Sequence, residues 1–437
     1  MAMYDKYTSA YTQLAPVVQE RVEKKRYPAL GFTSNLDLLC DFEVSILNRL
    51  LAQYLPQATA AEIKVPELIV TMEDLLHAII YFCMQGIGGE VEIANGSLLD
   101  EHFAWKQGMG GTGVQAAMAL AAIGCPSIVH LTDDSKEVCE ILDSPHIYTV
   151  SPEGELIHTN QVISTQEQEV HYIIQFKKGD IIQLGEERIT IPVSNRLILT
   201  KVTVNEHVPF FEPFFEYIEN HAASISSTVL SSFNCILDPA VLQARLEYLQ
   251  GHVERYKAGN PQGIVFFEEA HYHSEEIRKL CAETIYSSVD ILSLNEEELQ
   301  SLLAMYSFPH ASQDILSAVQ GVKFLREKFG IKQGVIVHTK DYSMYVGDKL
   351  GVDIERGLMY GNLVATAKAV QGWYATREQI GELLQLEESR VGLEALERIS
   401  SSEYRDEVVL VPTKYLDKPK YTIGLGDSFV AGVQLCF

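Results

Sequence analysis

Residues 421–432, Tyr-Thr-Ile-Gly-Leu-Gly-Asp-Ser-Phe-Val-Ala-Gly, place two glycines and an aspartate at the start of an apolar run. Glycine lets the backbone turn tightly and brings successive N–H groups close to a ligand. Because the N-terminus of a helix attracts anions, we expect an anion hole formed by the amides of Gly424, Leu425 and Gly426. Asp427 then serves either as a helix cap or as a general base beside that anion hole.

Upstream of this stretch, short apolar runs alternate with helical patterns. The spacing is typical of a doubly wound, mostly parallel α/β sheet. We expect strands at residues 229–232, 263–267, 290–293, 334–337 and 408–411, and helices at 239–256, 274–285, 296–305 and 312–329.

The first half of the chain contains a similar alternation and then a β-rich segment. A glycine loop at 108–113 precedes an expected helix at 114–123 and a strand at 127–131. From residue 146 to residue 200, strand-like pieces follow one another closely and turn signals separate them. This segment predicts a smaller β-rich domain that shares strands with residues 88–100. Its expected strands are 147–150, 155–158, 170–176, 180–184, 188–192 and 196–201.

The composition excludes several classes of protein. The chain has 437 residues, of which 47% are hydrophobic, so it has globular rather than disordered composition. Its formal net charge of −25 argues against a nucleic-acid-binding protein and against adhesion to anionic membranes. Seven cysteines lack the spacing of zinc sites or a disulfide framework, and no signal-like or membrane-spanning apolar run is present. We therefore expect a cytoplasmic protein with reduced thiols.

The glycine–aspartate stretch resembles the GXGD motif of the ribokinase-like superfamily. Within it, the chain is similar to the ADP-dependent glucokinase/phosphofructokinase family, because eight motifs occur in the same order between about residues 30 and 432. Tyr421 and Thr422 stand where ATP-using relatives carry Asp-Thr, and the chain is longer than those relatives, which favours the ADP branch. The other matching segments are 31–37 (ending Asn-Leu-Asp), 86–91, 110–111, 194–198, 267–270, 295–298 and 337–339.

The resemblance implies a ribokinase-like α/β fold with a smaller β-rich lid. The expected large domain comprises residues 1–37, 110–145 and 201–437. The expected lid comprises 38–109, including helices at 43–56 and 72–86, and 146–200.

The resemblance also implies a role for each matching residue. Asp427 would deprotonate the sugar hydroxyl, while the amides of Gly424–Asp427 hold the transferred phosphoryl group. Glu268 and Glu298 would hold Mg²⁺, partly through water, with ADP as the phosphoryl donor. The sugar would contact Asn35, Asp37, Glu90, Gly110, Gly111 and His171, and the nucleotide would contact Asn295, His338, Thr339, Leu416, Gly426 and the segment 363–370.

Some of these residues also have a purely structural interpretation. Glu298 lies in a glutamate run that follows Asn295, a typical helix cap, and His338 ends an expected strand. The sequence also departs from the family pattern. Phe266 replaces the histidine of the family's HxE motif, Thr112 follows the twin glycine and Ser428 follows the terminal aspartate.

The acceptor and the activity leave alternatives open. Glu90 and His171 favour a neutral hexose such as glucose, whereas Lys177, Lys178 and Arg196 could bind a phosphate of fructose 6-phosphate. An ATP-dependent kinase of another alcohol and a catalytically silent sugar or nucleotide sensor are the alternatives to an ADP-dependent sugar kinase. The expected partners are a small sugar and ADP, and the sequence gives no oligomeric state.

Overall fold

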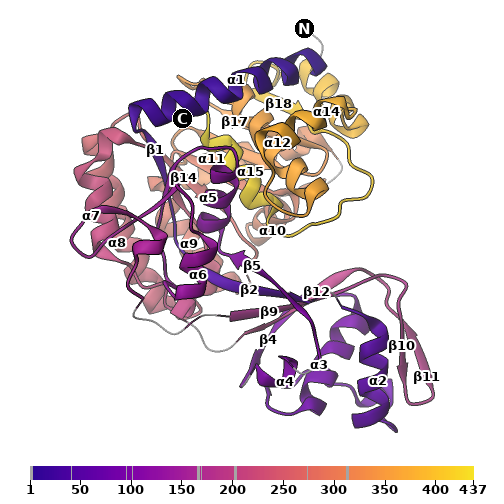
Figure 1. Cartoon of the computed structure of the whole chain (residues 1–437). Coiled ribbons are helices and arrows are strands. Elements are labelled where there is room, and N and C mark those ends of the chain that lie inside the picture. The colour runs from indigo at the N-terminus through magenta and orange to yellow at the C-terminus, as the bar shows by residue number, and fades with distance from the viewer. Residues whose placement is uncertain are drawn as a thin grey trace. The chain divides into compact units, whose positions relative to one another are not determined.

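The computed structural model describes residues 3–40, 42–94, 96–100, 102–164, 168, 170–200, 204–272, 274–311 and 314–437. The chain divides into two compact units (Figure 1). The larger unit comprises Met1–Ser34, Gly111–Ser164 and Asn205–Phe437, and the smaller unit comprises Asn35–Gly110 and Thr165–Val204.

A mixed sheet of ten strands forms the centre of the larger unit. Its strand order among the described residues is β18-β17-β16-β15-β14-β13-β1-β6-β7-β8. From β16 to β7 in that order, each strand is parallel to the next. Antiparallel strands, β17 and β18 at one edge and β8 at the other, flank this parallel part. The strands are β1 Tyr27–Leu30, β6 Ser127–Val129, β7 Ile147–Val150, β8 Leu156–His158, β13 Ile225–Leu230, β14 Ile264–Glu268, β15 Ile291–Asn295, β16 Gly334–His338, β17 Tyr342–Gly347 and β18 Val408–Pro412.

Helices cover this sheet and bury the apolar strands, as expected for parallel strands that are hydrophobic on both faces. One large core contains side chains such as Phe215, Val265 and Leu294, none of them accessible to solvent. Helices α12 and α15 pack side by side (Figure 1). The helices are α1 Met3–Lys24, α5 Thr112–Ala122, α6 Lys136–Ile141, α7 Glu212–Asn220, α8 Pro239–Gly259, α9 Glu275–Ile285, α10 Glu296–Met305, α11 Ile315–Phe329, α12 Ile354–Gln371, α13 Arg377–Glu382, α14 Arg390–Ser400 and α15 Leu425–Gln434.

The smaller unit has its own sheet and its own hydrophobic core. The sheet order is β3-β4-β12-β9-β2-β5, and β10 and β11 form a separate antiparallel pair. One face of the sheet packs with α2 and α3 around residues such as Leu76, Ile174 and Leu199. Its elements are β2 Asn35–Cys40, α2 Val44–Tyr54, β3 Leu68–Ile69, α3 Met72–Gln85, β4 Gly89–Ile93, α4 Ser97–Asp100, β5 Trp105–Gly110, β9 Val170–Phe176, β10 Ile181–Leu184, β11 Glu187–Thr190 and β12 Asn195–Thr200.

Most expected elements are present, and the α/β class with a mostly parallel sheet is confirmed. Residues 88–100 share a sheet with the later β-rich segment, because β4 pairs with β12. The expectation that residues 146–164 belong to the smaller domain is wrong. Strand β7 pairs with β6 and β8 pairs with β7, so this segment extends the sheet of the larger unit. Residues 201, 312 and 313 of the expected elements lie outside the described residues.

The segment 29–39, whose apolar residues predict one short buried strand interrupted by Ser34, Asn35 and Asp37, forms two strands. Strand β1 ends at Leu30 and belongs to the larger unit, whereas β2 begins at Asn35 and belongs to the smaller unit. The chain therefore passes from one unit to the other at the polar residues that interrupt this apolar segment. Within the described part of the chain, none of the helices combines the length and the hydropathy that crossing a bilayer requires.

Candidate active site

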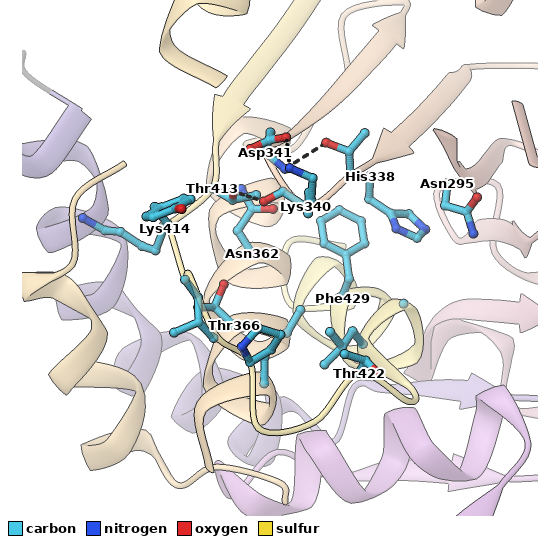
Figure 2. Close-up of a pocket in the computed structure, with 18 of the residues that line it drawn as sticks. Asn295, His338, Lys340, Asp341, Asn362, Thr366, Thr413, Lys414, Thr422 and Phe429 are labelled. Carbon is cyan, nitrogen blue, oxygen red and sulfur yellow. Dashed lines mark hydrogen bonds and ion pairs between the residues drawn. The ribbon is translucent and has the colours of Figure 1, made fainter. Parts of the chain in front are cut away.

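A cavity of about 700 Å³ lies in the larger unit, beside the ends of β15 and β16 (Figure 2). Its walls come from these strand ends, from α12, from the segment after β18 and from the first turn of α15. Ligands bind at the carboxyl ends of parallel strands in open α/β sheets, so its place in the fold is typical of a binding site. All five residues expected to contact the nucleotide line it, namely Asn295, His338, Thr339, Leu416 and Gly426.

Polar residues end three neighbouring strands at one edge of the sheet. Glu268 ends β14, Asn295 ends β15 and His338 ends β16, and Asn295 and His338 are register partners. His338 Nε2 lies 3.0 Å from Glu268 Oε1. The His338 ring also stacks on Phe429 of α15, with 4.7 Å between ring centroids (Figure 2). One histidine therefore joins the strand ends to the helix that carries Asp427.

These neighbours change the proton affinity of the strand-end groups. Burial alone would lower the pKa of His338, but the charge of Glu268 and its hydrogen bond raise that pKa above the usual value, and Glu298 adds to the effect. Burial, together with the negative charge of Glu268, raises the pKa of Glu298 to about 7. Two carboxyl groups are thus held close together in a site with little water to stabilise their charges.

Asn295 and Glu298 are confirmed as a helix-capping pair. The Asn295 side-chain oxygen accepts hydrogen bonds from the backbone N–H groups of Glu297 and Glu298, each at 2.9 Å. In return, Glu298 Oε2 accepts one from the Asn295 backbone N–H at 2.8 Å. This reciprocal arrangement is a capping box. Both side chains therefore have a structural role, and the proximity of Glu268 gives Glu298 a chemical environment that capping alone does not require.

The turn before α15 has the geometry that the glycine–aspartate stretch predicts. Gly424 is left-handed, with φ of 65°, and caps the helix. The next residues, Leu425 and Gly426, are the first of the helix, where backbone N–H groups have no intrahelical partner. Asp427 is partly buried in this first turn. The expected anion hole and the expected base thus lie on one helix turn, and Gly426 also borders the cavity.

Three side chains oppose the effect of burial on Asp427. Burial raises the pKa of its carboxyl group, whereas the charge of Lys368, a hydrogen bond from Thr112 and the charge of His338 lower it. Lys368 comes from α12 and Thr112 from α5. The carboxyl group is thus surrounded by a cation, a hydroxyl and an imidazole, each of which stabilises its ionised form.

In the smaller unit, a polar cluster occupies one face of the sheet. Asn35 Nδ2 donates to Asp37 Oδ1 at 2.7 Å and lies 3.2 Å from His171 Nδ1. Asp37 and His171 are register partners on β2 and β9, and Thr200 of β12 is in register with His171. Thr200 donates in turn to Glu90 Oε1 at 2.9 Å. Four of the expected sugar contacts therefore lie in one row across the sheet, with Asn35, Asp37 and His171 in contact with one another and Glu90 held by Thr200 on the next strands.

Close packing explains why residues 110 and 111 are both glycines. A Cβ atom at Gly110 would lie 2.6 Å from Asp37 Oδ1 and closer still to the Asn35 amide. Gly111 has φ of 99°, and a Cβ there would collide with the Thr33 carbonyl. Gly110 thus belongs to the polar cluster of the smaller unit, whereas Gly111 caps α5 in the larger unit.

A family model described as the ADP-specific Phosphofructokinase/Glucokinase conserved region matches residues 27–435. The chain belongs to this family. Among similar curated proteins are the ADP-dependent glucose/glucosamine kinase of Pyrococcus abyssi, 24% identical with 98% of this chain and 97% of that protein covered, and the ADP-specific phosphofructokinase of Thermococcus kodakarensis, 22% identical with 95% and 97% covered.

Solved structures of this kinase family have the same fold. The last common ancestor of ADP-dependent phosphofructokinases from Methanosarcinales superposes with a TM-score of 0.78 at 22% identity, over 99% of this chain and 97% of that one. An ADP-dependent kinase in complex with fructose-6-phosphate and ADPbetaS superposes with a TM-score of 0.75 at 20% identity, over 99% and 97%. At these identities the superpositions establish the fold.

The strand-end carboxylates of this family member fit a magnesium ion. Glu268 Oε2 is buried and has no hydrogen-bond partner, although its other oxygen contacts His338. An unpartnered buried carboxylate oxygen is costly, and Mg²⁺ prefers oxygen ligands. The described residues contain no group of three or more His, Cys, Asp or Glu side chains placed to hold a metal ion. Glu268 and Glu298 therefore suit an ion that takes few carboxylates and keeps several waters.

Several residues around these sites could not be assigned a role from the sequence. Thr112, Gln115 and Lys368 surround the first turn of α15, and Thr200 fixes Glu90. Arg278 Nη2 donates to the Glu298 carbonyl at 2.8 Å and so supports the start of α10. Lys368 alone carries a detectable signal, since it is a single lysine within the small and apolar stretch 363–370. Phe266, which replaces the histidine of the family's HxE motif, is fully buried in the sheet, where an apolar side chain packs well.

Proposed function

We propose that this protein is an ADP-dependent sugar kinase that transfers the β-phosphoryl group of ADP to a hydroxyl of a hexose and releases AMP. The observation that carries the proposal is the cavity in the larger unit, which has the size of a small-molecule site and is bordered by the first turn of α15. A nucleotide in that cavity would present its phosphates to free N–H groups at a helix N-terminus. The names of the relatives support ADP as the donor.

In the proposed reaction, Asp427 is the general base. Its carboxylate takes the proton of the acceptor hydroxyl, and the hydroxyl oxygen forms a bond to the β-phosphorus. The bond between that phosphorus and the oxygen bridging to the α-phosphate breaks, and AMP leaves with the electron pair. The N–H groups of Gly424, Leu425 and Gly426 would stabilise the charge on the transferring group, as positioned donors do in phosphoryl transfer.

Electrostatic stabilisation of Asp427 is required for this role. Burial raises the pKa of its carboxyl group, and Lys368, Thr112 and His338 oppose that rise and so favour the ionised form. Glu268 and Glu298 would hold Mg²⁺, which supplies charge neutralisation on the phosphate oxygens when bound. His338 and Phe429 then form the side of the cavity next to these carboxylates.

For the acceptor, the polar face of the smaller unit supports a neutral hexose. Asp37, His171, Thr200 and Glu90 form a row of hydroxyl-binding groups that carries negative charge. Of the cations expected to bind a sugar phosphate, Lys177 and Lys178 follow the end of β9, far from His171, whereas Arg196 is two residues from Ile198, the register partner of Glu90. Lys177 is six residues beyond His171, a separation of about 20 Å at the strand rise of roughly 3.3 Å per residue.

A hexose phosphate is the second candidate, and a specific observation favours it. Lys106 is the register partner of Leu39, two residues from Asp37 on the same face of the sheet. Its Cα atom lies about 7 Å along the strand from the row of Asp37, within reach of a lysine side chain. An ammonium at that place would suit a phosphate group attached to a sugar held by Asp37.

The test is phosphoryl transfer from ADP or ATP to glucose or fructose 6-phosphate in the presence of Mg²⁺. We expect AMP and a sugar phosphate with ADP, and higher kcat/KM with glucose. Asp427→Asn should lower kcat by about 10² to 10⁴-fold, the usual contribution of a general base. Its affinity for ADP should stay within about three-fold, since the amides remain. Asp348→Asn, at an exposed ion pair with Arg326, is the matched control and should retain full activity.

Three results would contradict the proposal. Turnover with ATP and none with ADP would support the ATP-dependent alternative. Tight binding of ADP or sugar without any turnover would support a silent sensor. Full activity of Asp427→Asn would exclude Asp427 as the base.

A further inference from the structure

A buried lysine lies directly behind the first turn of α15. Lys368, on α12, is 3% exposed. Its Nζ donates to the Gln115 side-chain oxygen at 2.8 Å and to the Gly424 carbonyl at 3.2 Å. The same ammonium lies 4.3 Å from the ring centroid of Tyr374 and 5.9 Å from that of Tyr421. Burying an ammonium is costly, so a lysine at this position must have a compensating role.

The contacts of Lys368 fix the backbone that begins the helix. The Gly424 carbonyl accepts from the Ser428 N–H at 3.1 Å and from the Ser428 hydroxyl at 3.0 Å, in addition to Lys368. A Cβ atom at Gly424 would lie 2.6 Å from Lys368 Nζ and even closer to Gln115. The peptide that precedes Leu425 is therefore held directly against the Lys368–Gln115 pair, and its orientation sets the direction of the following N–H groups.

Gln115 is itself held in place. Its side-chain oxygen accepts from Lys368 and lies 3.3 Å from the Tyr374 hydroxyl, which can donate to it. Gln115 comes from α5, the helix that also carries Thr112, the hydrogen-bond partner of Asp427. Helices α5, α12 and α15 thus meet around one ammonium group, and α15 packs against both of the others.

We propose that Lys368 is a positioning residue for phosphoryl transfer, which fixes the anion hole through the Gly424 carbonyl and places a positive charge behind the helix turn that carries Asp427. This inference rests on the proposed function, because it assigns Lys368 a role in the same reaction. Lys368 acts on the reacting groups through Gly424 and Asp427. Its ammonium group is held in place by Gln115 and Gly424, so it needs no rearrangement when negative charge moves onto the phosphoryl group.

Groups on several neighbouring elements face Asp427, and the effect of the Lys368 charge on the pKa of Asp427 must be compared with theirs. Thr112 faces it from α5 and His338 from β16, while Glu268 of β14 lies 3.9 Å from the Cβ position of Gly426. Lys368 lowers the pKa of Asp427 more than Thr112 or His338 does. Removal of the lysine charge should therefore raise that pKa, whereas loss of packing alone should not.

The experiment compares Lys368→Met, Lys368→Gln and Lys368→Arg with the wild-type protein. We expect Lys368→Met to lower kcat by at least about 10-fold and by no more than the roughly 10² to 10³-fold found when one preorganised donor is removed. The acid limb of the kcat profile should move to higher pH, and KM for ADP should change by less than about three-fold. Lys368→Arg should recover part of the activity and the wild-type acid limb. Lys368→Gln is close to the lysine in size without its charge, so it should fold and show the same shift as Lys368→Met.

Lys257→Met is the matched control for the loss of a partly buried lysine. Lys257 on α8 pairs with Asp290 at 2.9 Å and is remote from the site. This variant should lose thermal stability while its kcat profile stays unchanged. A Lys368→Met or Lys368→Gln variant that is less stable but has wild-type kcat and an unmoved acid limb would overturn the proposal.

A direct titration separates this inference from the proposed function. The ¹³C signal of the Asp427 carboxyl group, assigned by its absence in Asp427→Asn, should titrate at higher pH in Lys368→Gln than in the wild type. That result in a protein without turnover would keep the role of Lys368 and reject the kinase assignment. Sugar phosphorylation by the wild type, with an unchanged Asp427 titration and unchanged kcat in Lys368→Gln, would keep the kinase assignment and reject the role of Lys368.

Discussion

Glu298 shows how one side chain can serve both a helix and a reaction site. Its Oε2 atom closes the capping box with Asn295, and its neighbour Glu268 gives the pair of carboxylates that suits Mg²⁺. Glu298 can therefore have both the metal-binding role that the motif resemblance implies and the capping role that its position indicates. A change that removes the charge but keeps the acceptor oxygen can separate the two roles.

Glu298→Gln is that change. Glutamine also closes capping boxes and resembles the protonated carboxyl group, so the free energy of unfolding at pH 4.5 without Mg²⁺ should stay within about 1 kcal/mol of the wild-type value. The variant should lose the increase in melting temperature that Mg²⁺ gives the wild type, because binding to the native state stabilises it. Calorimetry with and without Mg²⁺ measures both. Glu275→Gln, on the first turn of α9, is the control, and an unchanged response to Mg²⁺ in Glu298→Gln would contradict a metal role.

Gly110→Ala tests the polar cluster of the smaller unit. The new methyl group would displace Asn35 and Asp37, since its Cβ would overlap their side chains. We expect KM for the sugar to rise at least about ten-fold, equivalent to roughly 1.4 kcal/mol, while the affinity for ADP stays unchanged. Gly351→Ala is the control, because no atom lies within 4 Å of its Cβ position. A variant with normal sugar KM would show that this cluster does not bind the acceptor.

At the scale of elements, sequence patterns predict which segments form strands better than which sheet they join. Residues 147–150 are a strand as expected, but their partner β6 lies in the larger sheet. Short strands in close succession give the same local pattern in either sheet, and the pairing depends on contacts distant in sequence. The sequence analysis also assigned no element to α12 as a whole, because its buried residues surround the helix rather than forming one stripe.

The same distinction applies to the candidate sites. Motif residues such as Asp37, Glu268 and His338 can be predicted because they lie in recognisable stretches, the last two at strand ends. Thr112 directly follows the twin-glycine motif and Lys368 lies in the segment 363–370, but only the folded structure places both side chains beside Asp427. The partner of Glu90 could not be predicted either, since Thr200 is 110 residues away and meets it through strand pairing.

The register of the strands in the smaller unit provides a test of where the acceptor sugar binds. If the sugar is held by the row containing Asp37, Lys106 lies one step along the face and Lys177 lies at the far end of β9. For glucose, Lys106→Met and Lys177→Met should both leave KM within about two-fold. For any turnover of fructose 6-phosphate, Lys106→Met should raise KM by about ten-fold or more, the value of one charged hydrogen bond. A larger effect of Lys177→Met would contradict this placement of the sugar.

At the scale of the whole molecule, buried titratable groups make opposing contributions to acid stability. His130 lies in the core of the larger unit among Phe32, Phe210 and Phe214. Its Nε2 accepts the Phe211 N–H at 3.0 Å, so Nδ1 carries the proton and donates to the Phe32 carbonyl at 2.9 Å. Both nitrogens are satisfied in the neutral ring, and burial lowers the pKa of His130 to about 4.

Whether each group stabilises or destabilises the fold as the pH falls depends on whether the native or the unfolded state binds its proton more tightly. Between about pH 6.5 and 4 the unfolded chain protonates His130 and the native protein does not, so His130 destabilises the fold as the pH falls. Glu298 acts in the opposite direction. Its pKa is about 7 in the native protein and 4.5 as an ordinary carboxyl group, so the native state binds the proton more tightly and gains stability as the pH falls. Asp427 and His338, whose pKa values are also raised, act as Glu298 does.

Each of the first two groups contributes about 2 to 3 kcal/mol between pH 7 and 4.5, at 1.36 kcal/mol per pKa unit. Their effects therefore nearly cancel in the wild type, and single variants should reveal them. In urea unfolding at constant ionic strength without Mg²⁺, His130→Gln should gain stability relative to wild type on going from pH 7 to 4.5, and Glu298→Gln should lose it. Because both variants are compared with the wild type at each pH, the general effect of the −25 net charge drops out. Slopes of the same sign in the two variants would show that these groups do not govern the acid response.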